Sequence, residues 1–460
     1  MNKLLYVIFF SLFNSSCVVG PNYTKEDLFS DKVIQKELNL NKPYRISKKW
    51  YEHIKDPQLN KLIDTGLQKN TDISIAIERL KQARVLLNIN QVQYLPQINA
   101  QGGYNYEKNS KNIKETIDSH YYTAGFDASW EIDLWGKTQR QREADIAKVE
   151  SLKYNLDNVR VTIISEIASI YIKMLVASEK LRITQNNLNL QKEIYKIIKQ
   201  KYTNNLIDDI TYNQAEYLVS TINAQIPLLE TDIENYKNAL STIIGVLPSQ
   251  LDINNTSSIF VEKYDYNTHM VYNLPANIIR NRPDVASAEQ TLISKNALIG
   301  KAITELYPNV NITAFFGYAS QGGTNLFSPQ SQSFNYSPLI SIPLLDWNRI
   351  KNNIKIQEYI KQEAFIQYQK TVLNAIAELK NAMNSFQNNV ERNKTLAKAL
   401  KNIQQATSLS RNKYKNGLLE YTELLNSEQN LLNAQNDYIE SKGQIFQSLI
   451  AYYKATGAGY

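Results

Sequence analysis

The chain has 460 residues, 43% of them hydrophobic and 10% aromatic, with a formal net charge of +7 at pH 7. This composition is too apolar for an intrinsically disordered protein. Lysines and acids alternate along the whole chain, which is typical of a solvated surface and gives no support to nucleic-acid binding. The 15 glycines and 12 prolines are about half of the roughly 32 and 23 that average usage gives. Long uninterrupted elements are therefore expected.

Hydropathy and the scarce metal-binding residues exclude further classes. The mean hydropathy of −0.41 excludes a bundle of transmembrane helices but not membrane β-strands, whose alternation leaves a weak hydropathy trace. The single cysteine, Cys17, excludes a disulfide framework and a cysteine-rich zinc site. The three scattered histidines His53, His120 and His269 argue against a histidine metal cluster. Phosphate-binding loops and nucleophile elbows are absent from the sequence, so we expect no enzyme, no metal and no cofactor.

The N-terminus has the layout of a secretory signal peptide. Lys3 precedes the apolar stretch 4–13 and the small residues Ser15 and Ser16, and this stretch is too short to span a bilayer. Cys17 follows where a bacterial lipoprotein would be cut and acylated. We therefore expect a signal peptide over 1–16 and a covalent lipid on Cys17. Asn14 replaces the aliphatic residue usual before such a cysteine, so a plain signal peptide with an incidental thiol stays open.

The chain repeats itself at a shift of 212 residues, without gaps. The aligned landmarks are Asp72 with Asp284, Pro96 with Pro308, Trp135 with Trp347, Lys201-Tyr202 with Lys413-Tyr414, and Gly245 with Gly457. Such a match indicates duplication. We expect one repeat over 71–245, a second over 284–457, and an N-terminal segment (17–70) and a linker (246–283) outside them.

Each repeat is expected to begin with a helix followed by two strands. In the first repeat, Ile73, Ile77, Leu80 and Ala83 recur at helical spacing, and Pro96 ends this helix. The period then becomes two, which predicts strands over 97–107 and 121–134, and in the second repeat over 309–319 and 333–344. These runs are long enough to cross a bilayer as tilted strands. A half-buried hairpin on a soluble core is the alternative for any one pair.

The alternation divides each strand into an apolar and a polar face. The apolar positions are even-numbered and include Ile98, Phe126, Leu134, Phe316, Ile342 and Leu344. The polar positions, which we expect to line a lumen, are Gln97, Asn99, Gln101, Asn105, Glu107, Thr123, Asp127, Ser129, Glu131, Asp133, Asn309, Asn311, Thr313, Ser337 and Ser341. Trp130, Trp135 and Trp347 are expected in an interfacial aromatic girdle.

Two long helices without glycine or proline follow the strands. We expect them over 137–202 and 349–414, and about 65 helical residues extend roughly 100 Å at 1.5 Å per residue. Gly417 and the pair Asn204-Asn205 stand where the chain would double back in a left-handed turn. Shorter return helices are expected over 211–244 and 420–455.

Four membrane strands cannot close a barrel alone, because an open sheet edge in lipid leaves backbone groups unsatisfied. Two copies or three would supply enough strands, and the residues themselves do not choose between them. The sequence, however, resembles the OprM/NodT branch of the TolC-like outer membrane factors. The resemblance rests on the motifs at 17–23 (CVVGPNY), 95–96, 130–137 (WEIDLWGK), 281–285 (NRPDV), 343–347 (PLLDW), 414–417 (YKNG) and 453–457 (YKATG).

This resemblance implies a trimer in the cell outer membrane. Its fold would be mainly α with membrane β: a 12-stranded β-barrel, four strands per chain, continuous with a long periplasmic α-helical barrel. Segments 17–70 and 246–283 would form a belt around it. The implied function is a passive exit duct of a tripartite efflux system. The implied partners are a periplasmic adaptor, an inner-membrane pump of the resistance-nodulation-division type, and outer-membrane lipid.

The two hairpin tips are the expected gate and docking surface. The gate candidates are Asp208, Asp209, Glu420, Tyr421, Glu423, Asn426 and Gln429. The expected adaptor contacts are Tyr202, Asn205, Leu206, Tyr414, Gly417 and Leu418. Acids at the start of a helix also stabilise its macrodipole, so a purely structural role for Asp208, Asp209 and Glu420 stays open. The family commonly uses an acid and an arginine where this chain has Asn426 and Gln429, which favours closure by amide hydrogen bonds here.

Two other functions stay open. A periplasm-spanning structural or adhesive coiled-coil lipoprotein would need the long helices and the lipid, but not two strand pairs of matched parity. A lipid-anchored periplasmic hydrolase has no candidate nucleophile and base.

Overall fold

A computed structural model describes residues 18–25, 28, 37, 49–108, 110, 112, 118–253 and 278–458. The signal peptide and Cys17 lie outside these residues. The chain forms two compact units, and each unit draws on both repeats. The first unit comprises Met1–Asp27, Arg79–Lys153 and Ser287–Lys370, and the second comprises Leu28–Glu78, Tyr154–Ala286 and Thr371–Tyr460.

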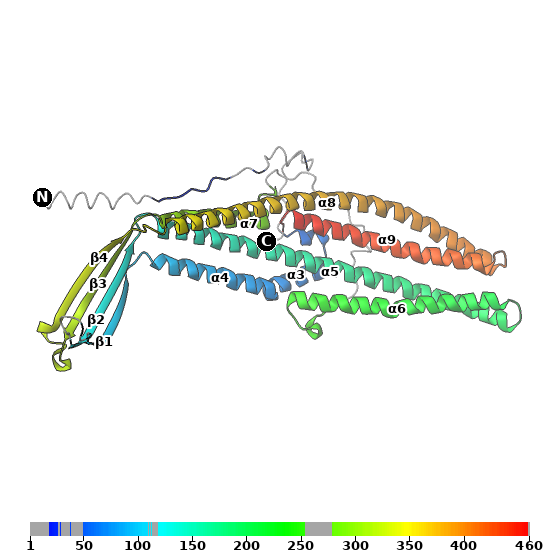
Figure 1. Ribbon diagram of the computed structural model, residues 1–460. Helices are drawn as coiled ribbons and strands as arrows, with labels where there is room; N and C mark the ends of the chain where they lie inside the picture. The colour runs from blue at the N-terminus through cyan, green and yellow to red at the C-terminus, as the bar shows by residue number, and fades with distance from the viewer. Residues whose placement is uncertain are drawn as a thin grey trace. The chain divides into compact units, whose positions relative to one another are not determined.

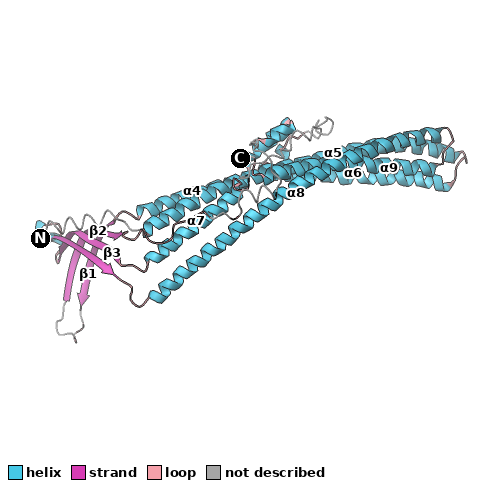
Figure 2. Ribbon diagram, turned by 90° about the horizontal axis from the view of Figure 1, so that it is seen from above, coloured by secondary structure: helices cyan, strands magenta, loops and turns pink. Residues whose placement is uncertain are grey.

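All described strands lie in the first unit, as one antiparallel sheet in the order β1-β2-β3-β4 (Figures 1 and 2). The strands are β1 (Gln97–Lys108), β2 (Asp118–Ile132), β3 (Asn309–Ser320) and β4 (Gln332–Ser341). Gln97 pairs with Ser129 in the first hairpin and Asn309 with Ser341 in the second. The two hairpins therefore share one register under the shift of 212. Strands β1 and β4 are the free edges of the sheet within one chain.

The helices repeat as the strands do. Helix α4 (Thr71–Val92) precedes β1 and α7 (Pro283–Thr304) precedes β3, and both ends are offset by 212. The long helices are α5 (Lys137–Thr203) and α8 (Trp347–Lys415), and the return helices are α6 (Asp209–Ile244) and α9 (Tyr421–Ala455). Gly245 and Gly457 follow the return helices with φ of 81° and 72°, the left-handed conformation that commonly ends a helix.

The middle of α5 is the core of the second unit. Ile164, Ile167, Tyr171 and Ile172 are fully buried there. By length and composition α5 is apolar enough to cross a membrane, but 67% of its most apolar window is buried inside the protein. The hydrophobic stretch is therefore explained by packing against the other helices of this unit.

Helix α3 (Pro57–Lys69) and the short helix η1 (Trp50–Ile54) were not expected from the sequence. Asp56 caps α3 by accepting hydrogen bonds from the backbone N–H groups of Gln58 and Leu59, and Pro57 stands at the first helical position, where its missing N–H has no cost. The Asp56 carboxylate also accepts a hydrogen bond from the Tyr171 hydroxyl at 2.9 Å. Trp50, fully buried, stacks on Tyr453 at 4.9 Å between ring centroids. A cap followed by proline was the signal available for this helix.

The strand ends differ from the sequence-based prediction at three apolar positions. Strand β2 ends at Ile132 and β4 at Ser341, so Leu134, Ile342 and Leu344 lie outside the sheet. Pro343 cannot donate to a strand ladder, and the segment after Ile132 begins α5. The alternating pattern therefore continues past the point where strand pairing stops.

Candidate functional site

The polar face of the sheet holds the predicted lumen residues that lie within strands. Register places odd-numbered residues opposite odd-numbered ones throughout: Asn99 pairs with Asp127, and Glu131 with Asn311. The residues that share this face are Gln97, Asn99, Gln101, Asn105, Glu107, Thr123, Asp127, Ser129, Glu131, Asn309, Asn311, Thr313, Ser337 and Ser341. Within the described strands this face carries three acids and no lysine or arginine.

Phe315 interrupts this polar face, and the sequence analysis missed it. Gly125 and Gly317 pair directly across β2 and β3. A Cβ at Gly125 would lie 3.0 Å from Cε2 of Phe315, and one at Gly317 would lie 2.9 Å from Cζ. The phenyl ring therefore fills the space above the glycine pair, where any side chain would displace it. Glycine in a strand often marks such a close approach, which was the available signal.

The opposite face is apolar and uncovered within one chain. Ile98, Phe126, Phe316, Phe334 and Ile340 each expose between 55% and 66% of their surface. Trp130 lies on this face, where its indole N–H donates to the Tyr94 carbonyl at 3.0 Å. A contiguous exposed apolar surface on a strand wall marks a membrane or protein contact.

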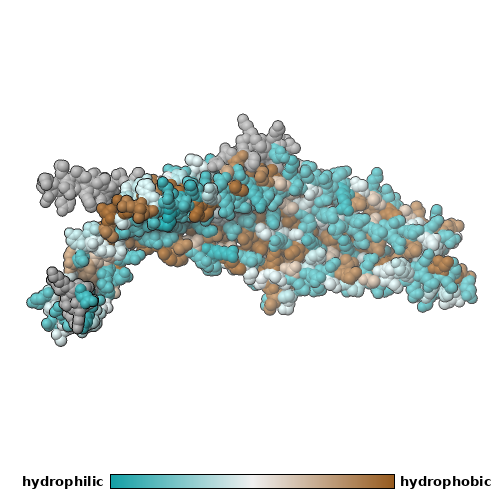
Figure 3. All heavy atoms as spheres, viewed as in Figure 1, coloured by the Kyte–Doolittle hydropathy of each residue, from teal (hydrophilic) through white to brown (hydrophobic). Residues whose placement is uncertain are grey.

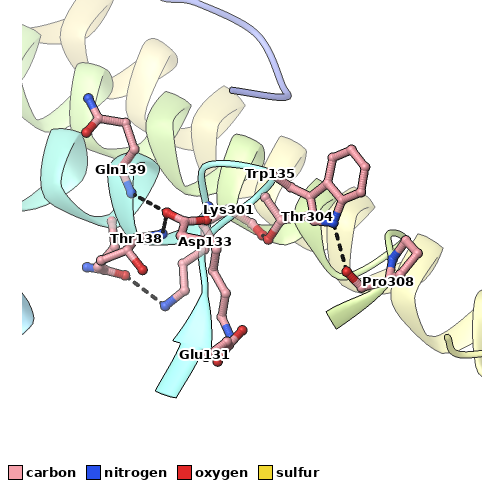
Figure 4. Close-up of polar contacts among 10 residues, drawn as sticks. Glu131, Asp133, Trp135, Thr138, Gln139, Lys301, Thr304 and Pro308 are labelled. Carbon is pink, nitrogen blue, oxygen red and sulfur yellow. Dashed lines mark hydrogen bonds and ion pairs between the residues drawn. The ribbon is translucent and has the colours of Figure 1, made fainter. Parts of the chain in front are cut away.

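Asp133 was predicted to line the lumen, and this is wrong. It lies beyond β2 and caps α5: its carboxylate accepts hydrogen bonds from the backbone N–H groups of Lys137, Thr138 and Gln139 at 2.6, 2.9 and 3.3 Å (Figure 4). The free N–H groups at a helix start favour a carboxylate there, and this overrides the parity of the preceding strand.

Trp135 and Trp347 also lie outside the strands. The Trp135 indole N–H donates to the Pro308 carbonyl at 2.8 Å, and its ring stacks on Tyr307 at 4.8 Å (Figure 4). This contact joins the first repeat to the second. Trp347 begins α8, is 46% exposed and lies beside Lys351. Their place in an aromatic girdle stays a prediction.

In the second unit, the two hairpin tips use the same turn. Asn205 and Gly417 adopt left-handed conformations with φ of 57° and 71°. The N–H of Leu206 donates to the Lys201 carbonyl and that of Leu418 to the Lys413 carbonyl, both at 2.9 Å. This is the Schellman pattern expected at a left-handed helix end.

The predicted docking residues divide into an exposed and a packed set. Leu206 and Leu418 are exposed by 70% and 74% at the two turns. Tyr202 instead stacks on Tyr212 at 4.5 Å, and Tyr414 packs against the buried tip core. The turns therefore present one uncovered leucine each.

A small core joins the two tips and contains Tyr421. Its members Ile198, Ala215, Tyr421 and Leu424 are at most 5% exposed, and they come from α5, α6 and α9. Burial raises the pKa of Tyr421 well above its ordinary value. The prediction that Tyr421 lines an aperture is therefore corrected: its ring supports the tip from inside.

The tip acids act differently from one another. Asp208 caps α6 by accepting from the Thr211 N–H at 2.9 Å, and this hydrogen bonding lowers the pKa of Asp208. Asp209 accepts a hydrogen bond from the Tyr202 hydroxyl at 2.7 Å. Glu420 occupies the N-cap position of α9 without a side-chain capping bond. The structural interpretation thus holds for Asp208. Glu423, Asn426 and Gln429 are exposed on α9.

A buried ion pair behind the second tip was not predicted. Glu428, 2% exposed, accepts two hydrogen bonds from the Arg411 guanidinium, at 2.5 and 2.7 Å. The first repeat has Lys199 and Glu216 at the corresponding positions, and both are exposed. The two hairpins are therefore alike in backbone and different in polar packing, which the repeat did not reveal.

The sequence matches the family model described as outer membrane efflux protein at residues 62–246 and again at 274–458. The second match begins 212 residues after the first, in agreement with the internal repeat. Relatives include Nodulation protein T of Rhizobium leguminosarum bv. trifolii, 25% identical, with 98% of this chain and 96% of the relative covered. The solvent efflux pump outer membrane protein SrpC of Pseudomonas putida is 27% identical over 89% and 87%.

Solved structures share the fold. The CmeC outer membrane channel of Campylobacter jejuni matches with a TM-score of 0.85 at 24% identity, over 96% of this chain and 95% of that chain. The open state of the MtrE outer membrane channel of Neisseria gonorrhoeae matches with a TM-score of 0.81 at 23% identity, over 96% and 98%. The expected fold class is confirmed.

Proposed function

Because the chain belongs to the outer membrane efflux protein family, and is thus an outer-membrane channel component of an efflux system, we propose that three copies form a passive exit duct opened by its partners. The observation that carries this proposal is the sheet. It has one polar face, one exposed apolar face and two free edges within one chain. Each unsatisfied backbone group at an edge in lipid costs several kcal/mol, so only further copies make the sheet compatible with a membrane.

Three copies agree with the TolC-like outer membrane factors that the chain resembles. The tripartite assembly would comprise this duct, a periplasmic adaptor and an inner-membrane pump of the resistance-nodulation-division type. The exposed turns with Leu206 and Leu418 are the proposed adaptor contacts. A passive duct leaves the choice of cargo to the pump, and the relatives' names accordingly refer to different processes, such as solvent efflux and nodulation.

A lipid on Cys17 would hold the mature N-terminus at the outer membrane. Mass spectrometry of the purified protein tests it, since acylation adds the mass of the attached chains to the N-terminal peptide. A Cys17→Ser variant is the control, and it should lack this mass.

Oligomeric state and ion selectivity test the duct directly. We expect the purified protein to have the mass of a trimer and to form channels in a planar bilayer with weak cation preference. On the polar face, Glu131 pairs with Lys137 at 2.8 Å, so Glu107 and Asp127 supply the net negative charge. Asp127→Asn combined with Glu107→Gln should reduce the preference for cations, whereas Lys108→Gln on the opposite face should not. Clear anion selectivity of the wild type would contradict this lumen, and a stable monomer would contradict the duct.

A further inference from the structure

Helices α5 and α7 come from different repeats and pack together in the first unit. The Ser151 and Thr291 hydroxyls are hydrogen-bonded at 2.9 Å, and the Ser294 hydroxyl donates to the Ala144 carbonyl at 2.8 Å. Ala144 and Ser151 are 2% and 4% exposed. This face of α5 is therefore covered by α7 within one chain.

The corresponding face of α8 is uncovered. A shift of 212 converts Ala144 and Ala147, both buried, into Ile356 and Tyr359, which are 53% and 72% exposed. Apolar side chains lie among polar ones over the helices on the face seen in Figure 3. A large exposed apolar residue at a position whose counterpart is buried indicates a surface that a partner covers.

Helix α4 has the complementary uncovered face. Its counterpart α7 buries Ala297 to 3% and Thr304 to 2% exposure, whereas α4 carries Val85 and Val92 at those positions, 56% and 60% exposed. The surfaces left open on α8 and α4 are thus the two halves of the contact that α5 and α7 make inside the chain.

The sheet leaves the same two halves open. Strand β2 of the first repeat pairs with β3 of the second, while β4 and β1 are the free edges. Because the two hairpins share one register under the shift of 212, the β2–β3 pairing can be transferred to β4 and β1 residue by residue.

We propose that the contacts between repeats within one chain are repeated between neighbouring chains, so that β4 pairs with β1, and α8 packs against α4, of the next copy. This inference rests on the proposed oligomeric duct and deepens it by fixing the register. Residue numbers of every β2–β3 pair add up to 442, as in Phe126 with Phe316. Raising β2 and lowering β3 by 212 preserves this total. Ser337 of one copy therefore pairs with Asn105 of the next.

The helices yield one specific ion pair. The hydrogen-bonded positions Ser151 and Thr291 convert into Glu363 of one copy and Arg79 of the next, which are both exposed in the single chain. Opposite charges on facing positions of two packed helices attract each other, and long side chains suit the wider spacing that Ile356 and Tyr359 impose compared with two alanines.

Disulfide cross-linking tests the register. Asn105→Cys with Ser337→Cys should give covalent dimers and trimers on oxidation. Within one chain, β1 and β4 are three strand spacings apart, about 14 Å, beyond the roughly 7 Å between Cα atoms that a disulfide bridges. The control is Gln101→Cys with Ser337→Cys, on the same face but four residues away, an offset of about 13 Å. We expect no covalent trimer from it.

Charge reversal tests the helices. Arg79→Glu should lower the temperature at which the trimer dissociates, and adding Glu363→Arg should restore it. Glu358→Arg is the matched control, because its counterpart Ile146 is 42% exposed and so lies away from the contact. Equal rescue by Glu358→Arg would overturn the Arg79–Glu363 pair.

The outcomes separate the inference from the function on which it rests. A trimer that cross-links through the shifted pair, or through neither pair, overturns the register and leaves the proposed duct standing. A wild-type chain that stays monomeric in detergent refutes the duct itself.

Discussion

At the residue scale, the acid after a strand and the acid after a turn both serve helix starts. Asp133 accepts three backbone hydrogen bonds at the start of α5. We expect Asp133→Ala to destabilise the protein by about 0.5–2 kcal/mol, the usual range for a lost N-cap, and Asp133→Asn to cost less. Hydrogen exchange of the amides at 137–139 measures this. Unchanged protection in the alanine variant would mean that the cap contributes nothing.

Asp208 predicts a pH dependence at the first tip. Its capping bond with Thr211 lowers the pKa of Asp208 below the ordinary value of 3.8. The folded state binds this proton less readily than the unfolded state, so the stabilisation is fully present above the unfolded pKa and is lost as pH falls through the lowered one. Asp208→Asn keeps a capping oxygen at every pH. Exchange of the amides at 209–212 should therefore match in the two proteins at pH 6, and the wild type should exchange faster only below about pH 4.

At the element scale, the segment after Cys17 is held to the first unit by Arg140. Its guanidinium is buried and donates to the Val19 and Gly20 carbonyls, both at 2.9 Å, and to the Asn22 side chain at 3.0 Å. Gly20 has a φ of 94°, and a Cβ there would lie 2.4 Å from Cα of Gly300. The close approach of two backbones explains why glycine stands in this motif.

We expect Arg140→Ala to release this segment, because three acceptors lose their donor. Trypsin cleavage after Lys25 should become severalfold faster while the trimer persists. Arg142→Ala is the matched control, since Arg142 is an exposed neighbour on the same helix. Equal cleavage rates in the two variants would show that Arg140 does not hold the segment.

The sequence predicted the elements because their signals are local and occur twice. Absence of glycine and proline placed both long helices within two residues of their observed ends. Other features depend on contacts between distant residues. The ring of Phe315 over the glycine pair and the burial of Glu428 against Arg411 arise from packing, and a single strand or helix pattern carries no sign of them. Asp133 failed for a related reason: capping and strand parity compete at one residue, and periodicity records only parity.

At the scale of the whole molecule, duplication makes the chain's own interior a template for its exterior. The junction between repeats was visible in sequence only as a shift of 212 residues. The structure adds which faces are covered, and the comparison of Ala144 with Ile356 then separates a surface that is complete in one chain from one that is not. Parity could not do this, because it assigns a residue to a face without saying what lies opposite.

Closure of the duct is the last property of the assembly that these residues predict. Asn426 and Gln429 are exposed on α9, near a tip whose buried core already contains Tyr421. The TolC-like factors commonly hold this region shut with an acid and an arginine, an interaction that salt screens. Amide hydrogen bonds are screened far less, so the resting conductance of this channel should change little between low and high salt beyond the change in bulk conductivity. Asn426→Ala with Gln429→Ala should raise the resting conductance in a planar bilayer, whereas Glu423→Gln, which keeps a side chain of the same size on the same helix, should not. Resting conductance unchanged by the double substitution would show that the amides do not close the aperture.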